Sequence, residues 1–310
     1  MTTALRFGIA LPNYGALASA ENLLRLARRA EARGIDSVWV SDHLVAPLRV
    51  GSLYPYDKRP DPQPGMGVIE EVYEPLTTLA FVAGATERIR LGVSVYVMPY
   101  RNPVVTAKTV ATLDALSGGR VIFGVGVGWL REEFAALGQD PRSRGRTTDE
   151  YLEVCRRLWR DDVAEFAGAH YVLPAVRSAP KPRQRPWPPI WVGGNSPAAQ
   201  ERAVRLGDGL HLIDLAPDEA AARVARVRDD LAHAGRDPAG FTVSVRTGIL
   251  VREEGSGEER PLQGTPGKIR RDAGAYAAAG VGYLVANLPH ARSIEALENA
   301  LDAAADALNS

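Results

Sequence analysis

The sequence predicts a single (β/α)8 barrel, the TIM-barrel fold, with two insertions, over residues 1–310. Short apolar segments of strand length alternate eight times with helical segments, a pattern typical of a parallel sheet covered by helices. No shift in composition marks a linker between two domains. Eight units favour a closed barrel, because the competing doubly wound sheet usually stops at about five to seven strands.

The first four units occupy the amino-terminal half of the chain. Their strands are expected over residues 5–11, 37–40, 89–97 and 120–126. Their helices are expected to begin after Ser19, at Pro75 and at Pro103, with a further helix over residues 148–160. Ser19 and Asn102 can cap the helices that follow them, and proline suits the first helical position because its φ angle is already helical.

The last four units show the same pattern of a strand followed by a helix. Their strands are expected over residues 189–194, 209–213, 241–251 and 282–288. Their helices are expected to begin at Pro197, Pro217 and Pro266 and after Ser293. Residues with a capping hydroxyl precede three of these four starts, which supports a helix at each of them.

Two longer segments interrupt the alternation, at about residues 43–74 and 129–188. The first is rich in Pro, Tyr and Gly and follows the second strand, and the other follows the fourth strand. Both leave the carboxyl-terminal ends of their strands, where barrels build their sites. We therefore expect these insertions to carry much of the substrate specificity.

The composition narrows the class of protein. With 37 basic and 37 acidic residues the net charge is zero, so nucleic acid is not an expected partner. No apolar run reaches the ~20 residues of a membrane span, and the amino terminus does not read as a secretory signal. One cysteine and five scattered histidines favour neither a disulfide nor a metal site. We expect a cytoplasmic protein.

Asp42 and His43 stand where the second strand meets its insertion. A carboxylate beside an imidazole at a barrel mouth provides a fixed acceptor and a group that titrates near neutral pH. The alternative interpretation is a capping aspartate next to an incidental surface histidine.

The run from Gly124 to Gly128 at the end of the fourth strand resembles a dinucleotide fingerprint, but Trp129 stands where that pattern needs a third glycine. Gly126 and Gly128 leave the backbone bare, so a flat ring could approach it. Close packing between strand and helix explains them equally well.

Residues Gly193, Gly194, Asn195 and Ser196 join the fifth strand to the next helix. Exposed N–H groups at a helix start favour an anion, so this turn is a candidate phosphate cradle. A plain connection with a serine cap is the alternative.

Three segments, residues 41–44, 91–134 and 189–209, resemble the bacterial luciferase-like monooxygenase superfamily, and within it the branch that uses the deazaflavin coenzyme F420. The resemblance runs end to end and implies a (β/α)8 barrel with the cofactor at its carboxyl-terminal mouth. It places Asp42 near the deazaflavin ring and His43 at its reacting face. It also implies a non-proline cis peptide at Ser94, with Val93 or Val95, behind the ring.

The same resemblance puts the backbone of Gly126 and Gly128 beside the ring, and the turn of Gly193, Gly194, Asn195 and Ser196 around a phosphate. One departure concerns Trp129, because some F420-dependent sugar-phosphate dehydrogenases carry a catalytic glutamate there. An apolar or aromatic substrate surface is therefore expected.

These features together predict hydride transfer between F420 and an unsaturated bond, carbonyl or alcohol of a small organic substrate, with His43 as proton donor or acceptor. A monooxygenase that uses reduced FMN is the first alternative, and a non-catalytic flavin-binding barrel is the second.

A homodimer is also expected, through the helices that flank strands two to four. An apolar patch of Thr78, Leu79, Phe81 and Val82 would supply the contact. Packing of the helix at residues 75–86 onto the barrel wall is the alternative use of these side chains.

Overall fold

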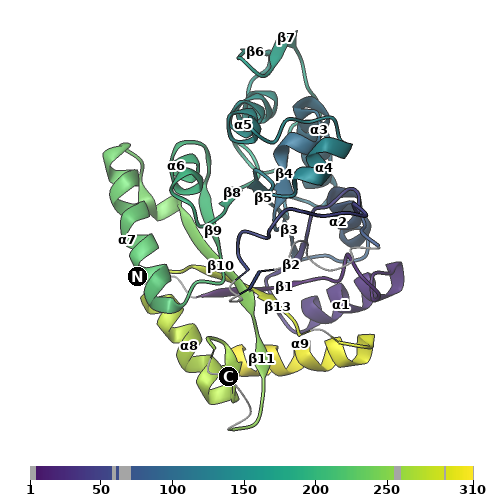
Figure 1. Ribbon diagram of the computed structural model, residues 1–310, viewed down its shortest axis with the longest axis vertical. Helices are drawn as coiled ribbons and strands as arrows, with labels where there is room; N and C mark the ends of the chain where they lie inside the picture. Colours follow the sequence, from purple (N-terminus) through teal and green to yellow (C-terminus); the bar gives the residue numbers. More distant parts are fainter. Residues whose placement is uncertain (1–4, 58–60, 63–70, 255–259, 290, 310) are drawn as a thin grey trace.

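Parallel strands close into a barrel at the centre of the molecule in the computed structural model, which describes residues 5–57, 61–62, 71–254, 260–289 and 291–309 (Figure 1). Around the barrel the order is β1 (Arg6–Ala10), β2 (Ser37–Val40), β3 (Arg90–Val93), β5 (Val121–Gly126), β8 (Ile190–Gly193), β9 (Gly209–Ile213), β10 (Thr242–Gly248) and β13 (Tyr283–Asn287). Pairing of β1 with β13 and of β3 with β5 completes the closure. The predicted (β/α)8 fold is confirmed.

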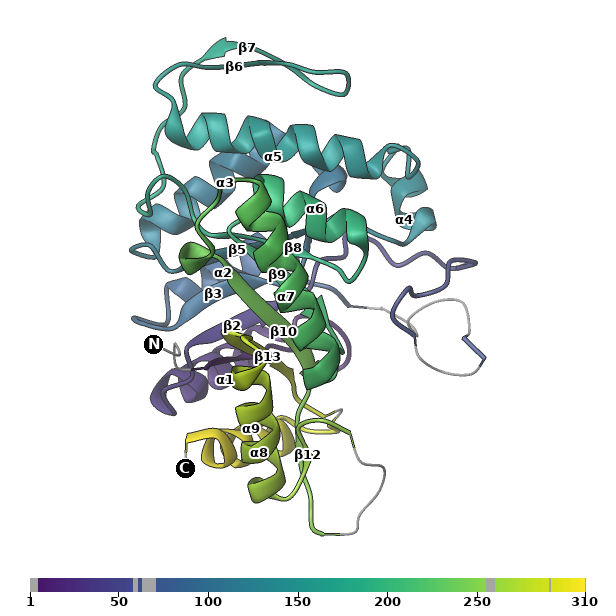
Figure 2. The ribbon, with the colours of Figure 1, turned by 90° about the vertical axis from the view of Figure 1, so that its left-hand side faces the viewer.

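Helices surround the strands on the outside (Figures 1 and 2). They are α1 (Ala20–Ala32), α2 (Pro75–Ala83), α3 (Pro103–Leu116), α5 (Arg144–Arg160), α6 (Pro197–Leu206), α7 (Pro217–His233), α8 (Pro266–Ala278) and α9 (Ile294–Asn309). The expected caps are present, since the side chains of Ser19, Asn102, Ser196 and Thr265 each accept a backbone N–H of the first turn. No helix of the described segments combines the length and the apolar character needed to cross a membrane.

The insertions contain elements that the sequence did not predict. In the second insertion a short helix α4 (Arg131–Ala136) precedes α5, which begins at residue 144 and not at 148. An antiparallel hairpin of β6 (Ala164–Ala167) and β7 (Val172–Val176) lies beyond α5, far from the barrel (Figure 2). Its strands expose most of their residues, so they lack the apolar alternation by which a strand is recognised.

Two predicted strands are divided. The third continues past residue 95 as β4 (Tyr96–Val97), followed by a 3-10 turn, η1 (Met98–Tyr100). The seventh ends at Gly248, and β11 (Leu250–Val251) then pairs outside the barrel with β12 (Gln263–Gly264). A second 3-10 turn, η2 (Pro238–Gly240), precedes β10.

Aromatic side chains fill the interior of the barrel. Trp39 stacks on Trp191 and on His211, with 5.4 Å between ring centroids in each case, and the edge of Tyr283 meets Trp39. Gly92 is required here, because a Cβ on it would lie 2.3 Å from the Trp39 indole. The centre is therefore a packed core, and a ligand can approach only from an open end.

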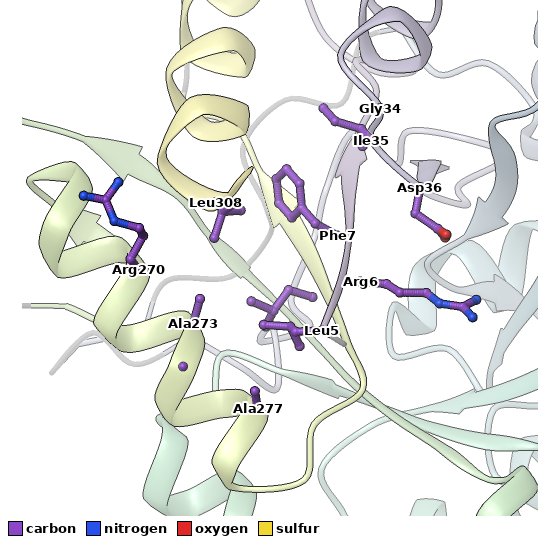
Figure 3. A pocket seen from close by; sticks show the side chains of 12 residues that line it. Leu5, Arg6, Phe7, Gly34, Ile35, Asp36, Arg270, Ala273, Ala277 and Leu308 are labelled. Carbon is purple, nitrogen blue, oxygen red and sulfur yellow. The ribbon is translucent and has the colours of Figure 1, made fainter. Parts of the chain in front are cut away.

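The amino-terminal end of the barrel carries a cavity of about 520 Å³ between β1, α8 and α9. In Figure 3 the apolar side chains of Leu5, Phe7 and Leu308 line it, between Arg270 on one side and Asp36 on the other. Barrel enzymes place their chemistry at the opposite, carboxyl-terminal end, so this cavity is separate from the candidate site.

Most of the apolar patch that was expected at a dimer interface is buried within this chain. Thr78, Leu79 and Val82 are at most 5% exposed and pack inside this chain, whereas Phe81 is 46% exposed. Helix α2 therefore uses three of the four side chains to cover the barrel wall. The prediction that these four side chains form an exposed contact patch is wrong, and the homodimer itself stays a prediction.

Candidate active site

Asp42 lies buried directly after β2 and binds across the barrel mouth. Both of its carboxylate oxygens accept hydrogen bonds from the Arg101 guanidinium, at 2.8 Å each, and Oδ2 also accepts the backbone N–H of Val97 at 2.8 Å. Burial raises the pKa of the Asp42 carboxyl, and the bonds from Arg101 act against that effect. Such a bidentate pair is rigid, so Asp42 holds the backbone of β4 in place.

These contacts lie within the chain, and the place of Asp42 near the deazaflavin ring stays a prediction. Groups of this chain bind the Asp42 carboxylate. Arg101 donates to it and also forms an ion pair with the Glu74 carboxylate at 3.1 Å. Arg101 also lies over the Tyr96 ring, 4.4 Å from the centroid. Asp42 thus supports the wall of the site through neighbouring residues.

His43 is positioned by a carboxylate that lies 90 residues further along the chain. Its Nδ1 is 2.9 Å from Oε2 of Glu133, in the first turn of α4. The His43 side chain is 12% exposed, and that of Glu133 is fully buried. Because an ionised carboxylate only accepts hydrogen bonds, Nδ1 is the donor, and Nε2 is left as the nitrogen that can take a proton.

Glu133 accepts several further hydrogen bonds. The backbone N–H of Leu44 donates to Oε1 at 2.5 Å, that of Val45 donates at 3.3 Å, and the Tyr100 hydroxyl donates to Oε2 at 3.0 Å. Burial alone would raise the pKa of Glu133, but the bonds from His43, Leu44 and Tyr100 outweigh it and the pKa is lowered. Glu133 is therefore an anion at neutral pH.

Sequence reasoning missed Glu133. The two adjacent carboxylates of the Arg131–Phe134 run were a usable signal, because acidic side chains favour the first turn of a helix. The partners of these two carboxylates depend on the path of the first insertion, which has no periodic pattern. The neighbouring Glu132 binds that insertion farther along, at the backbone N–H groups of Gly51 and Ser52.

The peptide bond between Ser94 and Val95 is cis, as the resemblance implied for this position. Ser94 follows the buried Val93 at the end of β3, and its N–H donates to the Val40 carbonyl at 2.8 Å. Its hydroxyl lies 2.7 Å from Nε2 of His211, whose Nδ1 lies 2.7 Å from the Ser244 hydroxyl. The role of Ser94 toward a cofactor stays a prediction.

His211 is the neutral side chain that connects Ser94 to Ser244. Burial, helped by the nearby Arg246 charge, lowers the pKa of His211 to about 3. Its ring is therefore uncharged at neutral pH and serves as a hydrogen-bonding spacer between β3 and β10.

Three glycines of the mouth are required by packing between strands. A Cβ on Gly126 would lie 2.5 Å from Val95 Cγ2, and one on Gly193 would lie 2.5 Å from Val95 Cγ1. At Gly128 a Cβ would meet the Val97 side chain at 2.7 Å and Phe134 at 2.8 Å. Val95, Val97 and Phe134 therefore lie against these glycines, and the approach of a flat ring to the backbone of Gly126 and Gly128 stays a prediction.

The turn at residues 193–196 uses its polar side chains locally. The amide of Asn195 pairs with the backbone of Ile213 in both directions, at 2.8 and 3.0 Å, and Ser196 caps α6 by accepting the Ala199 N–H. Gly194 has φ +128°, which L side chains rarely adopt. In this turn the Gly194 N–H donates to the His211 carbonyl at 3.0 Å, and the role of Asn195 and Ser196 toward a phosphate stays a prediction.

Aromatic side chains of the first insertion cover the mouth. Tyr54 meets the edge of Trp129, with 5.3 Å between centroids, and Tyr56 at 5.5 Å. The Tyr56 oxygen interacts with the backbone N–H of Asn195, so the insertion reaches the turn after β8. Burial raises the pKa of Tyr54 to about 12, which keeps this hydroxyl neutral. Trp129, where this sequence departs from some F420-dependent sugar-phosphate dehydrogenases, thus forms part of an aromatic surface.

The side chain of Arg246 extends from β10 to the ends of three other strands. Its Nε donates to Asn287 Oδ1 at 2.9 Å, and one terminal nitrogen donates to the Ser94 carbonyl at 2.5 Å and to the Ser94 hydroxyl at 3.0 Å. Both terminal nitrogens lie 3.3 Å from the Ser41 hydroxyl. Arg246 was not predicted, because an arginine inside a strand gives no sign of the direction in which it will point.

The described side chains hold no group of three or more possible metal ligands. The arrangement instead combines a histidine backed by a carboxylate, a cation at the barrel mouth and an apolar aromatic cover. Such a site can exchange one proton with a substrate while keeping water away from it.

Comparison with known proteins shows what this chain is similar to. The F420-dependent glucose-6-phosphate dehydrogenase of Amycolatopsis mediterranei is 34% identical over 192 residues, which cover 61% of this chain and 52% of that enzyme. The phthiodiolone/phenolphthiodiolone dimycocerosates ketoreductase of Mycobacterium tuberculosis is 31% identical over 243 residues, which cover 76% of this chain and 62% of that enzyme. This chain thus spans less than two thirds of either relative.

The crystal structure of the monooxygenase RslO1 from Streptomyces bottropensis superposes with a TM-score of 0.82 over 98% of this chain and 99% of that chain. At 23% identity this likeness concerns the fold alone. The profile of the luciferase-like monooxygenases matches residues 3–308, nearly the whole sequence. The chain therefore belongs to the luciferase-like monooxygenase family.

Proposed function

We propose that this protein is an oxidoreductase that moves a hydride between coenzyme F420 and a carbonyl, alcohol or unsaturated bond of a small organic substrate. The observation that carries the proposal is the His43–Glu133 pair, a histidine with its Nδ1 fixed by a buried anion at the carboxyl-terminal end of a barrel. Reduction of a carbonyl to an alcohol requires one hydride and one proton, and this pair can supply the proton.

The residues of the mouth fit a planar cofactor with an anionic tail. Ser94, Val95 and Arg246 would hold the ring, since they combine an apolar surface with hydrogen-bond donors. The turn from Gly193 to Ser196, at the start of α6, would hold the phosphate. When bound, the deazaflavin supplies the carbon that gives or accepts the hydride.

The protein's own residues orient the substrate and handle the proton. Glu133 keeps Nδ1 of His43 protonated, so Nε2 accepts a proton from a substrate hydroxyl during oxidation. The imidazolium that results is stabilised by the adjacent carboxylate, and in the reverse direction it donates that proton to the carbonyl oxygen. Tyr54 and Trp129 exclude water and present an apolar or aromatic substrate surface.

Two relatives support the choice of chemistry. One is named for dependence on F420, and the other is named a ketoreductase. The name of the family favours a second candidate, a monooxygenase that uses reduced FMN in the same barrel.

A titration of the purified protein with F420 and with FMN, read by fluorescence quenching, separates these candidates. We expect F420 to bind at least tenfold more tightly, a difference of about 1.4 kcal/mol. Equal binding, or tighter binding of FMN, would replace the proposal by the monooxygenase. Failure of both to bind at micromolar concentration would remove both.

A further inference from the structure

The interior of the barrel contains aromatic side chains in positions that branched aliphatic ones usually occupy. The buried cluster inside it consists of Trp39, Trp191, Tyr283, Ile122 and Val285. Valine, isoleucine and leucine dominate the inner layers of TIM barrels and fill them without a polar atom. An indole N–H or a phenol O–H is costly to bury unless it finds a partner. Close packing alone therefore does not require these three aromatic residues.

The three aromatic rings contact one another in a continuous row. Between ring centroids, Trp191 lies 5.4 Å from Trp39 and 5.1 Å from Tyr283, and Trp39 lies 6.2 Å from Tyr283. All three separations fall within the range of about 4.5–7 Å that is typical of aromatic rings in direct contact. An electron can therefore pass from one ring to the next without crossing solvent.

On the side of the mouth, the row of rings continues into His211. The Trp39 indole stacks on the His211 ring, with 5.4 Å between centroids and 6° between planes. His211 pairs in register with Gly193, the last residue of β8, and its Nε2 lies 2.7 Å from the Ser94 hydroxyl. Trp39 is thus connected to the candidate active site through a single ring.

On the amino-terminal side, the row of rings ends at a carboxylate. The Tyr283 hydroxyl donates to Asp36 Oδ2 and lies 2.5 Å from Ser37 Oγ, which also accepts the Trp39 indole N–H at 2.6 Å. Asp36 is half-buried and lines the cavity at the amino-terminal end of the barrel (Figure 3). Burial and the adjacent Asp36 raise the pKa of Tyr283 well above its ordinary value of 10, so the phenol is protonated. Asp36 is positioned to take that proton.

We propose that Trp39, Trp191 and Tyr283 carry an oxidising equivalent away from the active site, with Asp36 as the proton acceptor at the far end. An oxygen-derived radical at the mouth takes one electron from Trp39 and is reduced. Tyr283 returns an electron to Trp39, directly or through Trp191, and its O–H bond breaks as the proton passes to Asp36. The product is a neutral tyrosyl radical near the amino-terminal cavity.

The phenol is then restored from the amino-terminal side. A thiolate or ascorbate anion in the cavity supplies one electron and is itself oxidised, and Asp36 returns the proton to the Tyr283 oxygen. Each passage therefore consumes one electron from a soluble reductant and leaves the side chains of the mouth unmodified. No particular cofactor is needed, so this protection goes beyond the proposed function.

A photochemical oxidant attached at the mouth tests this route in the whole protein. The single cysteine, Cys155, is fully buried, whereas Leu53, next to Tyr54, is 54% exposed. A ruthenium polypyridyl complex would therefore label Leu53→Cys selectively, and a laser flash with a soluble quencher turns the complex into a one-electron oxidant. Radicals are followed by transient absorption and, after rapid freezing, by EPR spectroscopy. The attached complex takes the place of the oxygen-derived radical, so the result does not depend on whether F420 or FMN binds.

Four substitutions in this labelled parent separate the steps. Tyr283→Phe removes the phenol, Trp39→Phe removes the first ring, and Asp36→Asn keeps the size of the side chain but removes the carboxylate that takes the proton. Tyr276→Phe is the matched control, because Tyr276 is also buried but donates to the Leu215 carbonyl at 2.7 Å, which is not a base. A melting curve of each variant checks that it is folded.

We expect the labelled parent and Tyr276→Phe to form a tyrosyl radical that Tyr283→Phe and Trp39→Phe lack. Asp36→Asn should slow its formation by about 10²-fold, the lower end of what a positioned proton acceptor contributes. The labelled parent should form the radical more slowly in deuterium oxide, because the phenol proton moves with the electron. After repeated flashes, mass spectrometry should find more oxygen added to Tyr54 and Trp129 in Tyr283→Phe than in the labelled parent.

Several results would overturn the proposed route. A labelled parent without a tyrosyl radical refutes it with no variant needed. An unchanged radical in Tyr283→Phe would place the oxidation on another tyrosine, and one unchanged in Trp39→Phe would show that the electron bypasses the barrel interior. An unchanged rate in Asp36→Asn would exclude this carboxylate as the proton acceptor. Equal oxidation of Tyr54 and Trp129 with and without the Tyr283 phenol would refute the protection of the site.

Discussion

Replacing Glu133 by glutamine tests whether this buried carboxylate orients His43. Glutamine keeps the size of the side chain and one carbonyl oxygen, which can still accept the Leu44 N–H. It replaces the oxygen that faces His43 and Tyr100 with an NH2 group that donates. The variant therefore removes two hydrogen bonds to a charged acceptor without opening a cavity.

The expected cost follows from these contacts. A hydrogen bond to a charged group contributes about 1.5–3 kcal/mol, and the amide recovers part of that loss. We expect the free energy of unfolding to fall by about 2–4 kcal/mol at pH 7. Loss of the orienting bond on His43 should lower the hydride-transfer rate by about 10- to 100-fold, as for other groups that hold a functional histidine.

The effect on stability depends on pH in a defined direction. The pKa of Glu133 in the folded protein is lowered from the ordinary value of 4.5. A group with a lowered pKa stabilises the fold above its unfolded pKa and loses that contribution as the pH falls through the folded value. The difference between parent and variant should be largest near pH 7 and should shrink steadily below about pH 4.5.

Glu132→Gln is the matched control. It makes the same change of charge on the adjacent residue, and Glu132 binds the same insertion, at Gly51 and Ser52, without touching His43. Urea unfolding from pH 3 to 8 and single-turnover hydride transfer would be measured for both variants. Equal hydride-transfer rates in Glu133→Gln and Glu132→Gln would refute the orienting role. A difference in unfolding free energy between the parent and Glu133→Gln that does not change with pH would refute the electrostatic argument.

Further outcomes are expected elsewhere in the molecule. His43→Ala should lower kcat by about 10²–10⁴ with little change in cofactor affinity, and a single-turnover rate within threefold of the parent would leave His43 without a chemical role. Asp42→Ala should destabilise the fold by about 3 kcal/mol in denaturant unfolding, because Arg101 keeps only its contact with Glu74 and the Val97 N–H loses its acceptor; a loss below about 1 kcal/mol would contradict this. Gly126→Ala should cost about 1–3 kcal/mol through its clash with Val95, and the double variant with Val95→Ala should recover much of that loss if the contact is the cause. The exposed Phe81 would lie in the expected homodimer interface, so light scattering should give a dimer mass for the parent and a monomer mass for Phe81→Glu.

Much of the architecture follows from local pattern alone. The start of α3 illustrates this, because Asn102 and Pro103 specify a helix start through neighbouring atoms only. Most barrel strands were recognisable as short apolar runs between turn residues, whereas β10 alternates Val243 and Val245 with Ser244 and Arg246. Closure followed from counting eight such units.

The contacts of the site depend on atoms far apart in the chain. His43 meets Glu133 across 90 residues, and Arg246 meets Ser94 across 152. Placement of Asp42 and His43 at the mouth was predictable, since both follow a strand, but their partners were not, because no sequence period encodes the path of an irregular insertion.

What the sequence determined by itself is the barrel, the first residues of most helices and the expectation of a site at the carboxyl-terminal mouth. The tertiary structure decided what each glycine and polar residue does there. Gly126 and Gly193 have no room for a Cβ because Val95 packs against both of them, and the side chain of Asn195 bonds the backbone of β9. The physical reason is that backbone conformation is governed by adjacent residues, whereas the direction of a side chain and its partners are settled only when distant strands pack together.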